Sequence, residues 1–224
     1  YLFLTAMLAL NVSGELLNAF ILVDRSIKQA KETVEAKNEF LYSDFAMAFE
    51  TNKKKVGENY QKSLELKDKA DELVSHIDSL KQLFVTTADG PEYTPDNYLS
   101  VSNQDIAAQI MITEKGQERS HELKRMIKEY RDLLLSYVDP ADSALSNNIN
   151  IMLSTEDPPA VDGVQKSWQS EKFEHLPLAA SMALLSQIQT DVRNMESDVV
   201  RYLYTMVDEG AFKFNKIEPL VIPR

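Results

Sequence analysis

The first 23 residues form the most apolar stretch of the chain, and only Glu15 among them carries a charge. About 20 apolar residues are needed to cross a hydrocarbon core of ~30 Å, so Tyr1–Val23 predicts a transmembrane helix. The stretch begins at residue 1 without an initiator Met, and we therefore expect this span to be truncated at its start. A cleaved signal peptide and a buried core helix of a soluble protein are the alternatives.

Within this stretch Asn11, Glu15 and Asn18 recur at helical spacing and would share one stripe of a helix. Polar groups at membrane depth are costly without a partner or water, so the stripe predicts contact with another helix or a hydrated path. A second interpretation stays open, in which Glu15 marks the aqueous exit of the span. Asp24 follows closely and places the water boundary near Val23. Additional membrane contacts are expected at Tyr1, Thr5, Leu8 and Val12.

Apolar residues continue beyond Val23 in three- and four-residue steps, which extends the first helix to about Phe49. Similar faces predict three more helices, over about 60–84, 106–137 and 178–206. Turn residues separate them at Asp89–Pro91 and Asp139–Pro140. Pro177 suits the start of the last helix, and Asp208–Gly210 its end. The same heptad spacing fits an intrachain bundle or a dimer seam.

The pattern therefore predicts an all-α protein, in which a single N-terminal transmembrane helix continues into an up-down four-helix bundle. We divide the chain into a transmembrane helix (1–23), a helical bundle (24–211) and an extended linker toward absent downstream domains (212–224).

Composition supports this organisation and excludes several classes of protein. The 224 residues suffice for one domain, and 6 Gly with 8 Pro leave few places for sheet turns. A formal net charge of −11 with scattered basic residues argues against a nucleic-acid partner. The absence of Cys excludes disulfides and thiolate chemistry.

Candidate chemistry is sparse. Glu118 and His121 have the Glu-x-x-His spacing of di-iron bundles, but the second copy that such a site needs is missing, and His76 and His175 lack the spacing. No nucleophile motif is present. We therefore expect no enzyme activity, no metal and no cofactor. The basic run Lys53–Lys55 is interpreted as a solvated turn, and Trp168 as a core residue.

Two regions of the chain, one at its start and one near its C-terminus, resemble one known family. Tyr1–Ser13 and Glu15–Phe20 are similar to the membrane helix and exit of the GldM/PorM family, and four segments near the C-terminus resemble the last helix of that family's first periplasmic domain. These four are Phe173–Ala180, Gln189–Glu196, Tyr202–Tyr204 and Phe212–Asn215. The middle of the chain, about 50–165, matches only by the order and length of its helices.

The resemblance implies an inner-membrane motor subunit of the type IX secretion and gliding machinery. In that family two copies place their membrane helices inside a ring of the multi-span partner GldL/PorL, and proton flow drives a periplasmic shaft. The shaft engages GldK/GldN or their PorK/PorN counterparts through downstream domains. The implied location is the bacterial inner membrane, in contact with its lipid, with a single pass and the bulk of the chain in the periplasm. The family's basic residue early in the membrane helix has no counterpart here.

The competing interpretation is a periplasmic helical-bundle ligand sensor anchored by one membrane helix. It explains the same heptads, but the chain lacks a second span to return a signal. In the motor interpretation, Asn11, Glu15 and Asn18 contact the partner ring or the second copy, and the long first helix transmits movement out of the membrane.

Overall fold

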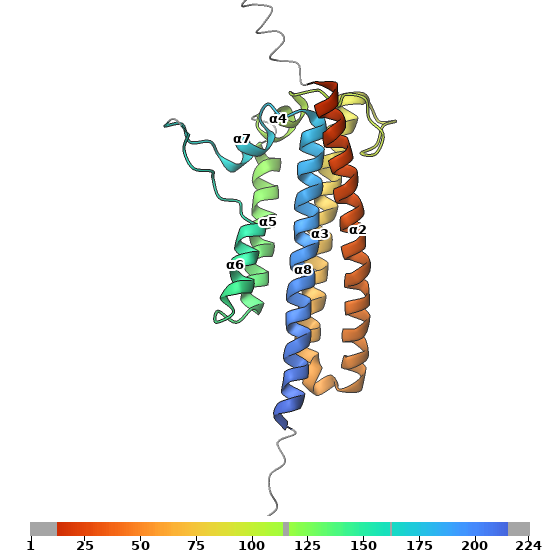
Figure 1. The fold of residues 1–224 in the computed structure, drawn as a ribbon, viewed down its shortest axis with the longest axis vertical. Coiled ribbons are helices and arrows are strands. Elements are labelled where there is room, and N and C mark those ends of the chain that lie inside the picture. Colours follow the sequence, from red (N-terminus) through yellow and green to blue (C-terminus); the bar gives the residue numbers. More distant parts are fainter. Residues whose placement is uncertain (1–12, 114–116, 162, 215–224) are drawn as a thin grey trace, which may run out of the picture.

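The computed structural model describes residues 13–113, 117–161 and 163–214, and this part of the chain is helical, as the sequence predicts. Three helices much longer than the others lie side by side in Figure 1, namely α2 (Gly14–Thr51), α3 (Lys53–Asp89) and α8 (Leu178–Phe214). Four shorter helices accompany them, namely α4 (Ile106–Met111), α5 (Gln117–Tyr137), α6 (Ser143–Met152) and α7 (Trp168–Phe173). Among the described residues, β-pairing is confined to two isolated bridges, Thr94 with Asn97 and Val161 with Val164.

The directions of the long helices differ from the predicted up-down order. α3 runs antiparallel to α2, but α8 runs parallel to α2, since Asp24 bonds to Ser186 and Tyr42 bonds to Glu196. After α5 the chain returns through the short helix α6, an irregular segment and the short helix α7. It then enters α8. The start of α2 and the end of α8 therefore lie at opposite ends of the bundle (Figure 1).

Local sequence explains where the long helices begin and end. Ser13 has an extended backbone, and its side chain accepts a hydrogen bond from the Leu16 N–H, so α2 begins at Gly14. The helix predicted from Tyr1 is therefore not continuous through Ser13. Asn52 ends α2, and its side chain caps α3 by accepting from the Lys55 N–H. Gly90 ends α3 at φ 113°, a value that favours glycine, and this confirms the break at Asp89–Pro91.

Two predicted boundaries are wrong. The helix expected over 106–137 is divided into α4 and α5, because the β-branched residues Ile112 and Thr113 favour a helix less and form a turn and a bend instead. The last helix does not end at Asp208–Gly210 but reaches Phe214, since one Gly costs a helix only about 1 kcal/mol. Residues 215–224, which make up most of the predicted linker, lie outside the described part.

The core fills the space between the three long helices and the shorter ones. Its largest fully buried side chains include Phe45, Phe84, Phe173, Leu66, Leu73, Ile77, Leu123 and Leu134. The loop before α4 holds the start of α8, because the Leu178 and Ala179 N–H groups donate to the carbonyl oxygens of Asn103 and Val101. α8 is thereby fixed at its start as well as along its length.

No described helix is long and apolar enough to cross a membrane. Most of the predicted span, residues 1–12, lies outside the described residues.

Candidate functional site

The face of α8 that packs against α2 and α3 is polar, although it is buried. The residues on this face recur mostly at three- or four-residue steps, and each is at most 9% exposed as a whole residue. We call this set the polar seam, and it consists of Ser186, Gln189, Thr190, Arg193 and Glu196. Burying polar groups without partners is costly, so their partners on α2 and α3 decide what the seam does.

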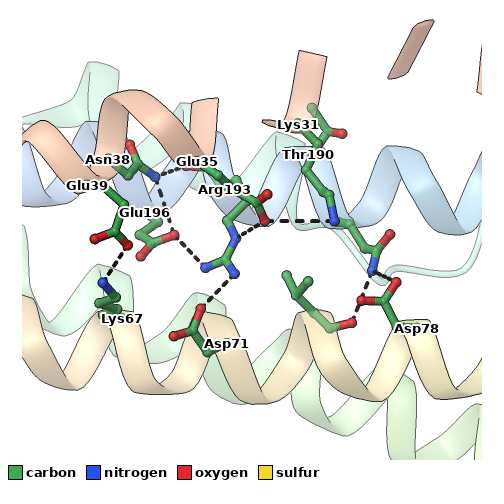
Figure 2. Close-up of polar contacts among 12 residues, drawn as sticks. Lys31, Glu35, Asn38, Glu39, Lys67, Asp71, Asp78, Thr190, Arg193 and Glu196 are labelled. Carbon is green, nitrogen blue, oxygen red and sulfur yellow. Dashed lines mark hydrogen bonds and ion pairs between the residues drawn. The ribbon is translucent and has the colours of Figure 1, made fainter. Parts of the chain in front are cut away.

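Arg193 lies at the centre of an ionic cluster that joins the three long helices. Its Nε lies 2.9 Å from Glu35 Oε1 on α2, its Nη2 lies 2.6 Å from Asp71 Oδ1 on α3, and its Nη1 lies 2.9 Å from Glu196 Oε2 on α8. Figure 2 shows the guanidinium pointing into the space between these carboxylates. Burial alone would lower the Arg193 pKa, but Glu196 and Asp71 outweigh it and raise that pKa. The arginine therefore stays charged.

Glu196 is held on both oxygens. Its Oε1 accepts from the Tyr42 hydroxyl at 2.7 Å, and its Oε2 accepts from Arg193 and, at 3.4 Å, from Asn38. Asn38 also donates to the Arg193 carbonyl oxygen at 3.1 Å, which ties α2 to the α8 backbone (Figure 2). Burial raises the pKa of Glu196, and burial with the neighbouring Glu196 raises that of Tyr42. Tyr42 is consequently a neutral donor.

A second cluster lies nearer the start of α2. Lys81 on α3 is 3% exposed and donates to Ser186 Oγ at 2.7 Å and to Gln189 Oε1 at 3.3 Å. Ser186 in turn donates to Asp24. Burial and the nearby Lys28 lower the Lys81 pKa to about 8, against the raising effect of Asp24 and Asp78. The Nε2 of the same Gln189 side chain donates to Asp78 Oδ1 at 2.7 Å.

Lys28 connects this second cluster to the loop between α3 and α4. Its Nζ lies 2.9 Å from Asp24 Oδ2 and 2.8 Å from Asp96 Oδ1, and it donates to the Pro95 carbonyl oxygen at 3.2 Å. An open groove of about 660 Å³ lies beside these groups, between α2, α3 and that loop.

The arrangement of the seam fixes the positions of the three long helices relative to one another. A one-turn slide of α8 along α2 and α3 would separate Arg193 from Glu35 and Asp71, and Glu196 from Tyr42, and leave these polar groups without their partners. Buried polar groups of this kind set the register between packed helices. In the described part of the chain no group of three or more His, Asp or Glu side chains is arranged to hold a metal ion.

Most of the site residues predicted from the sequence lie outside the part of the chain that the structure describes. Glu15 and Asn18 lie on α2 with exposed side chains, whereas Tyr1, Thr5, Leu8, Asn11 and Val12 lie outside the described residues. Asp24, which follows the predicted span, is 6% exposed and is bonded to Ser186 inside the bundle, a contact that the sequence does not predict. The signal that could have revealed the seam is a row of polar residues directly after the apolar positions of the last heptad series, namely Ser186, Gln189, Arg193 and Glu196.

The other singled-out residues behave as structural residues. Trp168 is buried edge-on against Phe173, with ring centroids 6.1 Å apart, which confirms a core role. Lys53–Lys55 are exposed at the start of α3. His76 is half-buried, and burial lowers its pKa, while His175 is exposed.

Comparison with known proteins supplies one match. A family model described as "GldM N-terminal domain" matches residues 15–205, which include α2, α3, the shorter helices and most of α8. No curated protein matches the sequence.

Proposed function

This chain belongs to the GldM N-terminal domain family, and from that membership we propose that it is a membrane-anchored motor subunit powering type IX protein secretion, gliding or both. In this proposal, proton motive force acts on a GldL/PorL-like membrane ring, and the chain carries the resulting movement into the periplasm. Downstream domains pass it to GldK/GldN- or PorK/PorN-like components. The chain itself catalyses no reaction.

One observation carries this proposal, namely the parallel pair α2 and α8 locked by the polar seam. At 1.5 Å per residue the 38 residues of α2 extend over about 57 Å. A movement that enters at the start of α2 would leave at the end of α8, at the opposite end of the bundle (Figure 1). Because Arg193 and Asn38 bond the two helices in one register, such a pair is suited to move as one rigid body.

The proposed anchor is Tyr1–Val23, which places the chain in the bacterial inner membrane with one pass and its bulk in the periplasm. Asn11, Glu15 and Asn18 would face the ring or the second copy. The exposure of Glu15 and Asn18 supports this role, since both side chains are accessible on α2.

The outer face of α2 supports a homodimer. Uncharged exposed residues follow alternating three- and four-residue steps along it, the spacing of a coiled-coil seam. This outer face consists of Ala19, Leu22, Ser26, Gln29, Thr33, Ala36, Phe40, Ser43 and Met47. Phe40 is 74% and Met47 60% exposed, a degree of exposure that a second copy would remove. In a parallel pair, Glu32 of one copy would flank Lys37 of the other.

The transmission proposal is tested by breaking the rigid connection at one point. In the full-length protein, a flexible Gly-Ser insertion between Val23 and Asp24, at the end of the proposed anchor, should stop secretion while leaving the protein assembled with its ring partner. The same insertion after Asn52, in the turn between α2 and α3, is the control and should leave secretion intact. Normal secretion with the first insertion would show that no movement passes from the proposed anchor into the rest of α2.

A further inference from the structure

A second surface of the molecule, on the side of α8 away from α2, has the composition of a binding groove. This groove of about 390 Å³ lies where α5, α6, α7 and α8 meet the segment that follows α6. Its apolar lining includes Ile127, Ile151, Leu153, Trp168, Leu184 and Ile188. Its volume falls within the range of ligand-binding clefts.

The polar lining of the groove is predominantly acidic. Glu156, Glu171 and Asp191 contribute carboxylates, and Lys172 is the basic residue among its lining side chains. Within the described residues, none of these four groups takes part in an ion pair. The groove therefore combines an apolar floor with excess negative charge.

Asp191 is the most informative of these groups. It is half-buried on α8, and its side chain accepts a hydrogen bond from Gln187 Nε2 at 2.8 Å, with no cation in ion-pair contact among the described residues. Burial raises its pKa to about 6, and the Gln187 bond opposes this only in part. On the opposite side of the same helix, each carboxylate around Arg193 has its cation. Asp191 is thus a carboxylate in apolar surroundings without a counter-ion.

Ile151 strengthens the case for an occupant. It lies at the end of α6, lines the groove and is 72% exposed. An isoleucine that lines a groove and remains exposed can bury apolar surface only against something outside the chain.

We propose that this groove binds a segment of a partner protein that presents a large apolar side chain next to a lysine or arginine. The apolar side chain would pack against Ile188, Trp168 and Ile151, and the cation would pair with Asp191. The complementary charge favours this occupant over a second copy of the chain, whose own net charge is −11. The inference is independent of the motor role.

Binding of model peptides to the full-length protein tests the proposal. A fluorescent peptide of alternating leucine and lysine should bind, while a leucine–glutamate peptide and a serine–lysine peptide should not, because each lacks one half of the required chemistry. Asp191→Asn should weaken binding by about tenfold or more. Asp198→Asn is the matched control, since Asp198 is also partly buried on α8 but does not line the groove, and it should leave binding unchanged.

Each other outcome overturns the proposal. Equal loss of binding in both variants would mean that the peptide is attracted by net charge alone. No loss in either variant would mean that Asp191 does not hold the cation of the peptide. Failure of the leucine–lysine peptide to bind the unaltered protein would remove the groove as a peptide site. Equally strong, Asp191-dependent binding of hexylamine would assign the groove to a small cationic ligand. Self-association that is lost in Asp191→Asn would assign it to a second copy.

Discussion

At the scale of single residues, Arg193 is the side chain on which the joining of the three long helices depends most. It meets carboxylates from α2, α3 and α8 while its own side chain is only 11% exposed. Removing Arg193 leaves the Glu196 carboxylate, which is 2% exposed, buried without its cation, and this is the costly case for buried charges.

We therefore expect Arg193→Met to destabilise the protein by about 3–5 kcal/mol, measured by urea unfolding. Arg125→Met is the matched control, because Arg125 also pairs with two carboxylates, Glu122 and Glu129, but on the exposed surface of α5. Exposed ion pairs contribute little to stability because solvent screens them, so the control should hardly change the free energy of unfolding. Equal effects of the two substitutions would contradict a special role for the seam.

The residues of the polar seam could not be predicted as a site from the sequence. Glu15 and Asn18 are conspicuous because they are polar in an apolar stretch, and both are exposed. Asp24, by contrast, gives no sign in the sequence that it is buried in the bundle. Its burial depends on Ser186, which is 162 residues distant in sequence. A pairing of that range leaves no local signal.

At the scale of the elements, sequence periodicity located the long helices well but not their directions. The α2–α3 hairpin follows from the one-residue connection at Asn52. The direction of α8 depends on how the chain returns after α5, through a helix with Ile149 as its one fully buried residue and an irregular segment. The sequence allows a short helix to begin at Asp139–Pro140, but its weak apolar pattern does not predict that the chain returns along the bundle, so the parallel pairing of α8 with α2 was not predicted.

The outer face of α2 gives the prediction at this scale. If it is the dimer seam, Phe40→Glu combined with Met47→Glu should convert the full-length protein from dimer to monomer, because two charges would then face their own copies across the seam. Both side chains are exposed, so the unfolding free energy should hardly change. Mass measurement by light scattering in detergent provides the readout.

Leu99→Glu is the control for this substitution, since Leu99 is 66% exposed on the loop between α3 and α4, away from α2's outer face. It should leave the dimer intact. A dimer that persists in the double variant would place the contact between copies elsewhere on the molecule.

At the scale of the whole molecule, the bundle has a strongly held part and a weakly held part. α2, α3 and α8 share the polar seam and most of the core, whereas α6 and the segment over 153–167 are largely exposed. A bundle built in this way can transmit movement through its long helices while the groove beside α6 adapts to an occupant. The two proposed activities would therefore use different parts of one domain.

Hydrogen exchange should reveal this division. We expect the amides of α8 between Leu178 and Val200, with those in the middle of α3, to exchange only on global unfolding, because their side chains are mostly buried. The amides of α6 should exchange about tenfold faster or more, since few apolar contacts hold that helix. Equal protection of α6 and α8 would mean that the domain opens as one unit. If the groove is a binding site, the leucine–lysine peptide should slow exchange in α6 while leaving α3 unchanged, because of these two helices only α6 lines the groove.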